Sequence, residues 1–213
     1  PEGTDERVVR AAARLKFEGL VEPIILGVPE DVHTLLTDFG FSNPGITVIN
    51  PNNYANFDTM RQEFITLRKG KVDESQADEI LRDVNYFGVM LVQLGLAEGM
   101  VSGAIHSTAD TVRPALQIIK TKPGVKRTSG VFLMVKDQHK FVFGDCAINI
   151  EPDAETLAEI AIQSAETAKT FGIDPKVAMI SYSTKGSGSG PRVDKVVEAT
   201  RIEQELRPDL LID

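Results

Sequence analysis

The stretch VEPIILGVPEDVHTLLTDFGFSNPGITVIN, residues 21–50, decides the fold class. Its first apolar run, residues 21–28, predicts a buried strand, and ITVIN at 46–50 predicts another. Between them, residues 30–39 have the apolar spacing of a short helix. A strand, a helix and a second strand in succession are typical of α/β proteins whose strands run parallel. We therefore expect an α/β fold with a mostly parallel sheet.

The same alternation continues toward the middle of the chain. Residues 55–69 predict a helix, with an apolar face formed by Phe57, Met60, Phe64 and Leu67. Residues 74–94 also have helical spacing, and GMVSGAI at 99–105 predicts a strand that ends in small residues. Because proline suits the first turn of a helix, Pro114 predicts a helix from about Arg113 to about Thr121.

The second half of the chain predicts a hairpin followed by alternating helices and strands. Apolar runs at 131–135 and 140–148, separated by four polar residues, favour an antiparallel hairpin. Residues 153–172 predict a helix, with an apolar stripe of Leu157, Ile160, Ala161, Ala165, Ala168 and Phe171. The remaining expected elements are a strand at 177–183, a helix at 192–206 and the start of a strand at 210–213.

A break in this pattern divides the chain into two domains. KPGVKRTSG at 122–130 interrupts the alternation, so we expect a first α/β domain over 1–126 and a second over 127–213. GSGSG at 186–190 is the one low-complexity stretch, and it fits a flexible surface loop as well as a ligand-binding loop.

Composition excludes several classes of protein. The 213 residues, 42% hydrophobic and 25% charged, are enough for one large or two small globular domains. No apolar run reaches the length of a membrane span, and no secretory leader is recognisable. The net charge of −8 disfavours nucleic acids and anionic membranes as partners. Cys146 is the single cysteine, which excludes an internal disulfide and a cysteine-based zinc site and indicates a cytoplasmic protein.

Three segments follow predicted strands or begin helices, where α/β proteins bind ligands. The first is PEGTDER, residues 1–7, in which Thr4 or Asp5 can cap a helix with Arg7 in its first turn. A solvated arginine on a capped surface helix explains this segment as well as a binding role does.

The second segment is SGAIHSTADTVRP, residues 102–114. It combines hydroxyl groups, a helix start and an arginine, which together can bind an anion; these residues are Ser107, Thr108, Thr111 and Arg113. His106 could donate a hydrogen bond to a carbonyl or phosphoryl oxygen, or simply be a packed side chain. Asp110 opposes an anion, and it could hold Arg113 or cap the helix.

The third segment is SYSTKGSGSG, residues 181–190, whose hydroxyls, Lys185 and glycines have the composition of a phosphate-binding loop. It contains neither a GxxxxGK[ST] nor a GxGxxG motif in a nucleotide-binding context. GSGSG matches the letters of a G-x-S-x-G nucleophile motif, but no histidine partner is evident, so we discount it. Cys146 follows Asp145 in an apolar run, which favours packing over a role as nucleophile.

Several separated motifs give the chain a strong resemblance to a known family. They are PEGTDERVV, ITLRKGK, NYFGVMLVQLGLAEGMVSGA, HSTADTVRP, DCAINIEPDAETLAEIAI and KVAMISYSTKGS. In this order, and over almost the whole chain, they resemble the phosphate acetyltransferases, or phosphotransacetylases, of the phosphate acetyl/butyryl transferase family. KTKPGVKRTSG and the strict HSTADTVRP favour acetyl over butyryl chemistry.

The resemblance implies a function and a set of site residues. The family transfers an acetyl group reversibly between coenzyme A and phosphate, by direct attack of the thiolate on acetyl phosphate in a ternary complex. By this resemblance Arg113 would be a catalytic residue that binds the acyl phosphate, and Arg7 and Arg68 would bind coenzyme A or phosphate. The further implied substrate-binding residues are His106, Ser107, Thr108, Thr111, Ser183, Thr184, Lys185 and Gly186.

The resemblance also implies the wider architecture. We expect a two-domain fold like that of isocitrate and isopropylmalate dehydrogenases, a homodimer, and no metal or cofactor besides coenzyme A as substrate. The family's acid/base aspartate lies in a late N-D-L-S-R-G motif that these 213 residues do not contain, so we expect a chain truncated at both ends. The alternatives are a non-catalytic module that binds acyl-CoA or acyl phosphate, a phosphate butyryltransferase and, less favoured, a dehydrogenase.

Overall fold

The computed structural model describes residues 1–41 and 45–213. The chain forms two compact units, Pro1–Lys120 and Thr121–Asp213. The sequence pattern predicted the domain division at 126/127, which lies a few residues after the boundary between Lys120 and Thr121. Each unit is described separately.

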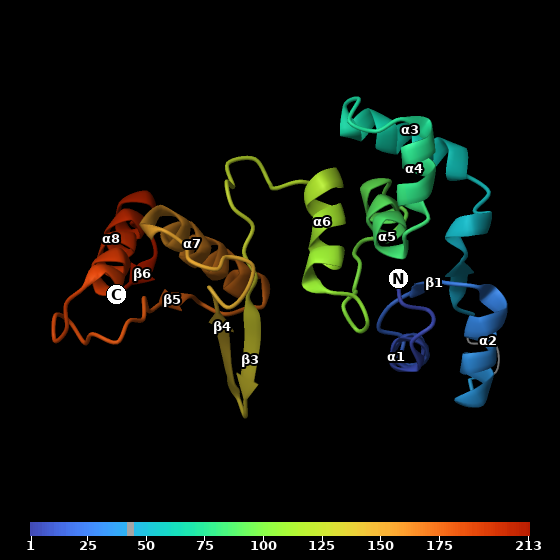
Figure 1. The fold of residues 1–213 in the computed structure, drawn as a ribbon. Helices are drawn as coiled ribbons and strands as arrows, with labels where there is room; N and C mark the ends of the chain where they lie inside the picture. Colours follow the sequence, from blue (N-terminus) through green and yellow to red (C-terminus); the bar gives the residue numbers. More distant parts are fainter. Residues whose placement is uncertain (42–44) are drawn as a thin grey trace. The chain divides into compact units, whose positions relative to one another are not determined.

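The first unit begins with a helix, α1, which is followed by the predicted strand, helix and strand (Figure 1). Strands β1 and β2 pair in parallel, with Ile24 opposite Thr47. The elements of this unit are α1 (Glu6–Phe17), β1 (Ile24–Leu26), α2 (Pro29–Asp38), β2 (Thr47–Ile49), the 3-10 turn η1 (Pro51–Asn53), α3 (Phe57–Arg68), α4 (Glu74–Leu81), α5 (Val84–Gln93) and α6 (Thr108–Ile118).

The N-terminal segment is held against β1. Gly3 donates a backbone hydrogen bond to the carbonyl oxygen of Leu26 at 3.1 Å. A Cβ at Gly3 would lie 2.5 Å from that oxygen, so only glycine allows the two backbones to approach this closely. From here Asp5 caps α1, whose buried residues Val9 and Ala13 pack beside α2. The segment that carries Glu2 is therefore fixed between a strand and a helix.

Helix α5 lies at the centre of the larger apolar core. On α3, the predicted apolar face is confirmed: Met60 and Phe64 are fully buried, and Phe57 and Leu67 are partly buried against the same core. The ring of Phe64 meets that of Tyr86 on α5 edge to face, with ring centroids 6.2 Å apart. Helix α6 packs beside α5, so the core fixes the position of α6.

The prediction of one helix over 74–94 is wrong. The structure has α4 and α5 with a break at Arg82 and Asp83. The Asp83 carboxylate accepts hydrogen bonds from the backbone N–H groups of Asn85 and Tyr86, at 2.9 and 3.0 Å. Aspartate at this position begins a new helix, because it satisfies N–H groups that have no partner inside the helix.

Two predictions around residues 99–121 are also wrong. Residues 99–105 form a loop, because the backbone N–H groups of 103–106 bind the side chain of Glu2, and no strand among residues 1–41 and 45–213 pairs with the segment. Helix α6 begins at Thr108, with Ser107 as its cap, and Pro114 lies inside it. Proline there removes one backbone hydrogen bond of the helix interior, which the sequence pattern did not anticipate.

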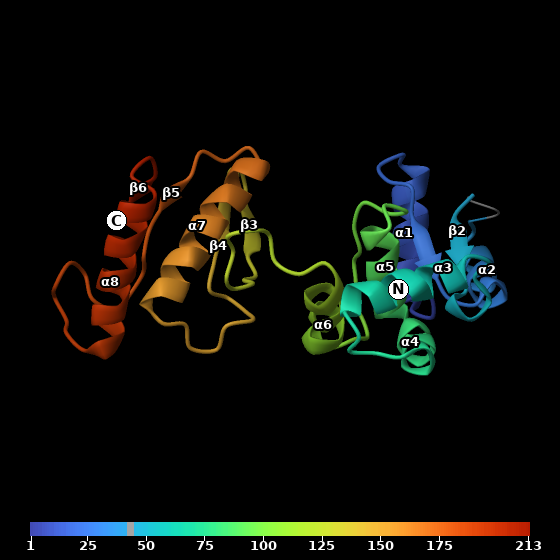
Figure 2. The ribbon, with the colours of Figure 1, turned by 90° about the horizontal axis from the view of Figure 1, so that it is seen from above.

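The second unit consists of a hairpin, two long helices and a short parallel strand pair (Figure 2). The hairpin is confirmed: β3 and β4 are antiparallel, joined by a tight turn in which Asp137 has φ 55°. Helix α7 packs against both α8 and β4. The elements are β3 (Phe132–Lys136), β4 (His139–Phe143), α7 (Ala154–Thr170), β5 (Lys176–Val177), α8 (Pro191–Leu206) and β6 (Leu211–Ile212).

Most of the predicted stripe on α7 is buried, but Phe171 lies just beyond the helix and is exposed. The expected strand at 177–183 shortens to β5, which pairs in parallel with β6. The described residues therefore form a mixed α/β structure with three two-stranded sheets, two of them parallel. In residues 1–41 and 45–213, no helix is both long and apolar enough to cross a bilayer.

Candidate functional site

A buried carboxylate organises the loop that leads into α6. The Glu2 side chain accepts hydrogen bonds from four consecutive backbone N–H groups, those of residues 103–106, at 2.8 to 3.2 Å. The imidazole Nδ1 of His106 lies 2.9 Å from the same carboxylate. Burial acts to raise the pKa of Glu2, but the hydrogen bonds from Ile105, His106 and Ala104 outweigh it and lower that pKa to about 2.

Arg7 joins the N-terminal segment to the same loop. As predicted, Asp5 caps α1 with Arg7 in its first turn; Asp5 accepts the backbone N–H of Arg7 at 2.9 Å. The Arg7 guanidinium donates to the Asp5 carboxylate at 2.7 and 3.0 Å and to the carbonyl oxygen of Ala104 at 3.0 Å. Its side chain is still 68% exposed, so it is positioned by these contacts and remains accessible to a ligand.

Ser107 and Asp110 form a capping box at the start of α6. The Ser107 hydroxyl accepts from the backbone N–H of Asp110 at 3.2 Å and donates to the Asp110 carboxylate at 2.6 Å. This hydroxyl lowers the pKa of Asp110. Of the two roles considered for Asp110, the capping role is the one observed, and the Ser107 hydroxyl is engaged in building the helix start.

The other hydroxyls of this segment differ in their surroundings. Thr108 is exposed on the first turn of α6. Thr111 donates to the carbonyl oxygen of Ser107 at 3.1 Å and approaches the Ser102 hydroxyl at 3.4 Å. Ser102 in turn donates to the fully buried Asn85 at 2.6 Å. A short polar chain thus runs beneath α6 into the core.

Two further predicted residues are Arg68, which contacts the last turn of α6, and Arg113, which belongs to α6. Arg68 donates from its guanidinium to the carbonyl oxygen of Gln117 at 3.2 Å, and Tyr86 donates its hydroxyl to the Gln117 side chain at 3.0 Å. Arg113 is exposed. Burial raises the pKa of Tyr86, and the positive charges of Arg113 and Arg68 partly counteract that rise.

Sequence reasoning missed Glu2, Tyr86 and Gln117. No sequence motif distinguished Tyr86 or Gln117 from the other residues of their helices. One indirect signal for Glu2 lies in the run of small residues Ser102, Gly103 and Ala104. If this run does not pair as a strand, its backbone N–H groups need another hydrogen-bond acceptor, and a carboxylate such as that of Glu2 can supply one.

In the second unit, the loop over 181–190 closes on itself by hydrogen bonds. The Ser183 hydroxyl donates to the Gly188 carbonyl at 3.1 Å and accepts the Gly188 N–H at 2.9 Å, and the Thr184 N–H donates to Ser187 at 2.8 Å. Lys185 and Gly186 occupy its left-handed corner, with φ of 44° and 87°. Lys185 pairs with the terminal residue Asp213 at 3.1 Å, and its side chain is mostly exposed.

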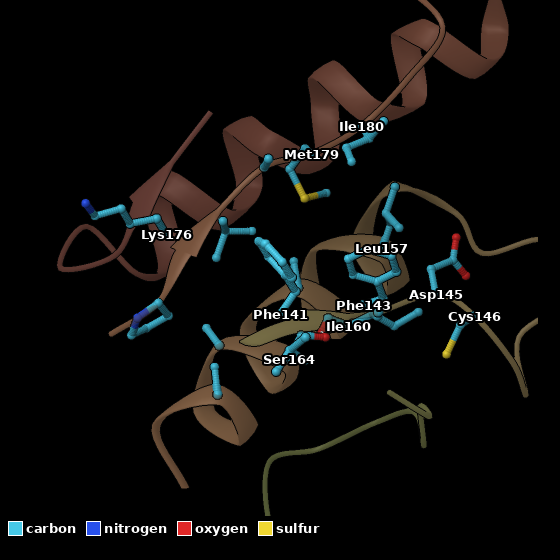
Figure 3. Close-up of a pocket in the computed structure, with 18 of the residues that line it drawn as sticks. Phe141, Phe143, Asp145, Cys146, Leu157, Ile160, Ser164, Lys176, Met179 and Ile180 are labelled. Carbon is cyan, nitrogen blue, oxygen red and sulfur yellow. The ribbon is translucent and has the colours of Figure 1, made fainter. Parts of the chain in front are cut away.

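The second unit also has an apolar cleft of about 910 Å³ (Figure 3). Residues from β4, α7, α8 and the segment after β5 line it; Phe141, Leu157, Ile160, Met179 and Ile180 are among them. Ser181 and Tyr182 reach the cleft, but the predicted residues Ser183, Thr184, Lys185 and Gly186 do not line it. Cys146 borders the cleft and donates its thiol to the Gly130 carbonyl at 3.4 Å, in a loop after β4 instead of a strand.

Among residues 1–41 and 45–213, no three histidine, cysteine or acidic side chains gather as metal ligands would. The prediction that no metal is needed stays a prediction. All the predicted residues of the first unit lie in or against residues 104–117, with Arg7 at the start of this span and Arg68 at its end; the others are His106, Ser107, Thr108, Thr111 and Arg113. Ser183, Thr184, Lys185 and Gly186 belong to the second unit.

The fold and this segment define a class: α/β proteins with an arginine-bearing, hydroxyl-rich junction between a loop and a helix, suited to a small anion. The protein-family model described as "Phosphate acetyl/butaryl transferase" matches residues 1–213. The chain belongs to the phosphate acetyl/butaryl transferase family.

Individual relatives are similar over the whole chain. It is 50% identical over 213 residues to a phosphate acetyltransferase of Bacillus subtilis, covering 100% of this chain and 66% of that protein. It is 54% identical over 205 residues to one of Staphylococcus epidermidis, covering 96% and 62%. A phosphotransacetylase structure from Streptococcus pyogenes superimposes with a TM-score of 0.93 at 68% identity, covering 100% and 65%. The chain thus spans slightly less than two thirds of the length of these relatives.

Proposed function

We propose that this chain acts in the reversible transfer of an acetyl group between coenzyme A and phosphate. In the proposed reaction the coenzyme A thiolate attacks the carbonyl carbon of acetyl phosphate within a ternary complex. A carbon–sulfur bond forms, the bond from the carbonyl carbon to the phosphate oxygen breaks, and phosphate leaves with the bonding electron pair. The names of the relatives and the family of the chain support acetyl transfer.

One structural observation carries the proposal for this chain. Three arginines from three helices lie along residues 104–117: Arg7 of α1 contacts Ala104 before α6, Arg113 belongs to α6 itself, and Arg68 of α3 contacts Gln117 in its last turn. An acyl phosphate presents two or more anionic oxygens, and arginine binds such groups with paired, directional hydrogen bonds. The presence of three arginines along this one segment supports the binding of an anionic ligand there.

The roles we propose follow from the exposure of each side chain. Arg113, exposed on α6, binds the acyl phosphate and stabilises the charge that develops on it as the carbon–oxygen bond breaks. Arg7 and Arg68 bind phosphate or coenzyme A. Thr108 offers an exposed hydroxyl to the same anion, and Ser107 and Thr111 build the helix start that presents it. Ser183, Thr184, Lys185 and Gly186 contribute from their own loop in the second unit.

The proposal extends to partners and assembly. Acetyl phosphate, phosphate and coenzyme A are the proposed ligands, and coenzyme A acts as a substrate and not as a bound cofactor. We also propose that the protein is a cytoplasmic homodimer with the dehydrogenase-like two-domain fold. Size-exclusion chromatography with light scattering tests the dimer.

Mixing the purified chain with acetyl phosphate and coenzyme A, and following the loss of free thiol, tests the function. We expect thiol loss that depends on both substrates and is faster with acetyl phosphate than with butyryl phosphate. Faster reaction of butyryl phosphate would favour the butyryltransferase alternative. Binding of both ligands without turnover would favour the alternative of a binding module for these 213 residues. Absence of both binding and turnover would contradict the proposal.

A further inference from the structure

We propose that Glu2 is a positioning residue, which shapes the loop before α6 and holds His106 as the tautomer that carries its hydrogen on Nδ1. The conformational part of this inference stands on the contacts of Glu2 alone. Its consequence for substrate binding rests on the proposed function.

The contacts of Glu2 engage both oxygens of its carboxylate. Oε1 accepts from the backbone N–H groups of Gly103, Ile105 and His106 at 3.2, 2.8 and 3.1 Å, and Oε2 accepts from that of Ala104 at 3.0 Å. The side chain is almost fully buried. A carboxylate has about four acceptor sites, two on each oxygen, so Oε1 is shared among three N–H groups and the imidazole, whereas Oε2 receives one N–H group. No neutral side chain could satisfy four converging N–H groups.

The carboxylate is delivered from a rigid part of the fold. Gly3 is hydrogen-bonded to β1, with no room for a side chain, and Asp5 caps α1. Glu2 directly precedes Gly3, and its own carbonyl oxygen accepts the backbone N–H of Asp5 at 3.0 Å. The loop at 103–106 has no strand partner in the described part of the chain, and Gly103 adopts a φ of 112°. The rigid segment therefore determines the conformation of the loop, and with it the direction in which α6 begins.

The same carboxylate determines which nitrogen of His106 carries the hydrogen. Its hydrogen bonds keep the pKa of Glu2 at about 2, so at neutral pH it can only accept. Nδ1 of His106, 2.9 Å away, must therefore be the donor. In the neutral ring Nε2 is left as an acceptor, and within the described residues it has no hydrogen-bond partner.

This changes what His106 can do for a ligand. The sequence suggested that His106 donates to a carbonyl or phosphoryl oxygen. With Nδ1 committed to Glu2, the neutral ring instead accepts a hydrogen bond at Nε2. Under the proposed function, the hydrogens available to it are those of a thiol or of a protonated phosphate oxygen. The Glu2 carboxylate also occupies the four backbone N–H groups of 103–106, so a substrate anion cannot bind to these groups. The arginines along residues 104–117 are left to bind that anion.

The first test needs no variant. Nitrogen-15 NMR of the imidazole of His106 in the intact 213-residue chain, at a pH where the ring is neutral, distinguishes the two tautomers. We expect Nδ1 to have the shift of a protonated nitrogen and Nε2 that of an unprotonated one. A predominance of the Nε2–H tautomer, or averaged shifts for the two nitrogens, would overturn the inference.

The second test removes the charge of Glu2. Glu2→Gln keeps the size of the side chain, Glu2→Ala opens a space for a small carboxylate, and Glu6→Gln is the matched control because Glu6 is exposed in the first turn of α1. We expect amide hydrogen exchange at 103–106 to become about 10-fold faster or more in both Glu2 variants and to be unchanged in the control. Added formate should slow that exchange again in Glu2→Ala alone.

Unchanged exchange in folded Glu2→Gln would refute the positioning role, as would a failure of formate to protect folded Glu2→Ala. If Glu2→Ala does not fold, Glu2→Gln and the tautomer of the unmodified chain still decide the question. In a preparation with transferase activity, we expect Glu2→Gln, but not Glu6→Gln, to lower kcat/KM. If no transferase activity exists, the His106 tautomer and the amide exchange rates still decide whether Glu2 is a positioning residue.

Discussion

Replacing Arg113 by alanine separates a functional arginine from a structural one. Arg113 is exposed on α6 and makes no hydrogen bond or ion pair with the described residues. Its removal should therefore change the free energy of unfolding by less than about 0.5 kcal/mol. One local effect is expected: the pKa of Tyr86 should rise further, because the charge of Arg113 opposes the rise caused by burial.

The expected effect on catalysis is larger. A hydrogen bond to a charged group contributes about 1.5–3 kcal/mol, which corresponds to a loss of about 10- to 150-fold in kcat/KM. Arg113→Lys keeps the charge but loses the paired geometry, so it should retain activity between that of the parent and that of Arg113→Ala. Arg14→Ala is the matched control, since Arg14 is exposed and pairs only with Glu18 on the surface of α1.

Steady-state rates with varied acetyl phosphate, together with thermal unfolding of each variant, measure both expectations. The assay uses a preparation in which the parent protein turns over. The reasoning is refuted if Arg113→Ala keeps the kcat/KM of the parent, or if it loses activity only in proportion to a lowered Tm.

Two further changes test the fold that supports the site. Gly3→Ala should destabilise the first unit by about 1–3 kcal/mol, because the added Cβ would lie 2.5 Å from the Leu26 carbonyl oxygen. Chemical denaturation measures this loss, and a midpoint equal to that of the parent would contradict the expectation. Burial of Glu203, whose carboxylate oxygens have no hydrogen-bond partner among the described residues, raises its pKa from 4.5 to about 7. Because the folded state holds this proton more tightly, the contribution to stability is fully present below pH 4.5 and is lost as pH rises through 7. Glu203→Gln should remove that part of the pH dependence of unfolding, and an unchanged profile would argue against it.

Local patterns predicted the elements whose partners lie nearby in the sequence. The strand, helix and strand over 21–50 are confirmed as β1, α2 and β2, and the hairpin as β3 and β4. In each case apolar spacing and turn residues decide the structure, because the partners lie within about 30 residues. The two compact units divide after Lys120, and the domain boundary expected at 126/127 stays a prediction.

Contacts between distant residues account for the wrong predictions. Residues 99–105 have the composition of a strand, but Glu2, about 100 residues away, takes their N–H groups. Asp83 divides the helical segment 74–94, since its carboxylate caps α5, and apolar periodicity does not report caps. Pro114 is tolerated inside α6, where the sequence rule placed it in the first turn.

The candidate site shows the same division. Arginine and hydroxyl residues could be named from the sequence because their chemistry and the family resemblance single them out. Their shared position could not, because Arg7 and Arg68 reach residues 104–117 through contacts that span 97 and 49 positions. The roles of Arg7, Arg68 and Arg113 toward a substrate stay predictions.

Titration of the chain with inorganic phosphate, followed by NMR of backbone amides and arginine side chains, tests the central claim most directly. We predict saturable shifts in the amides of 104–113 and in the side-chain signals of Arg7 and Arg113, with Arg14 unaffected. Shifts confined to the loop at 183–186, or the absence of any saturable shift, would contradict the proposal that residues 104–113 bind phosphate together with Arg7 and Arg113.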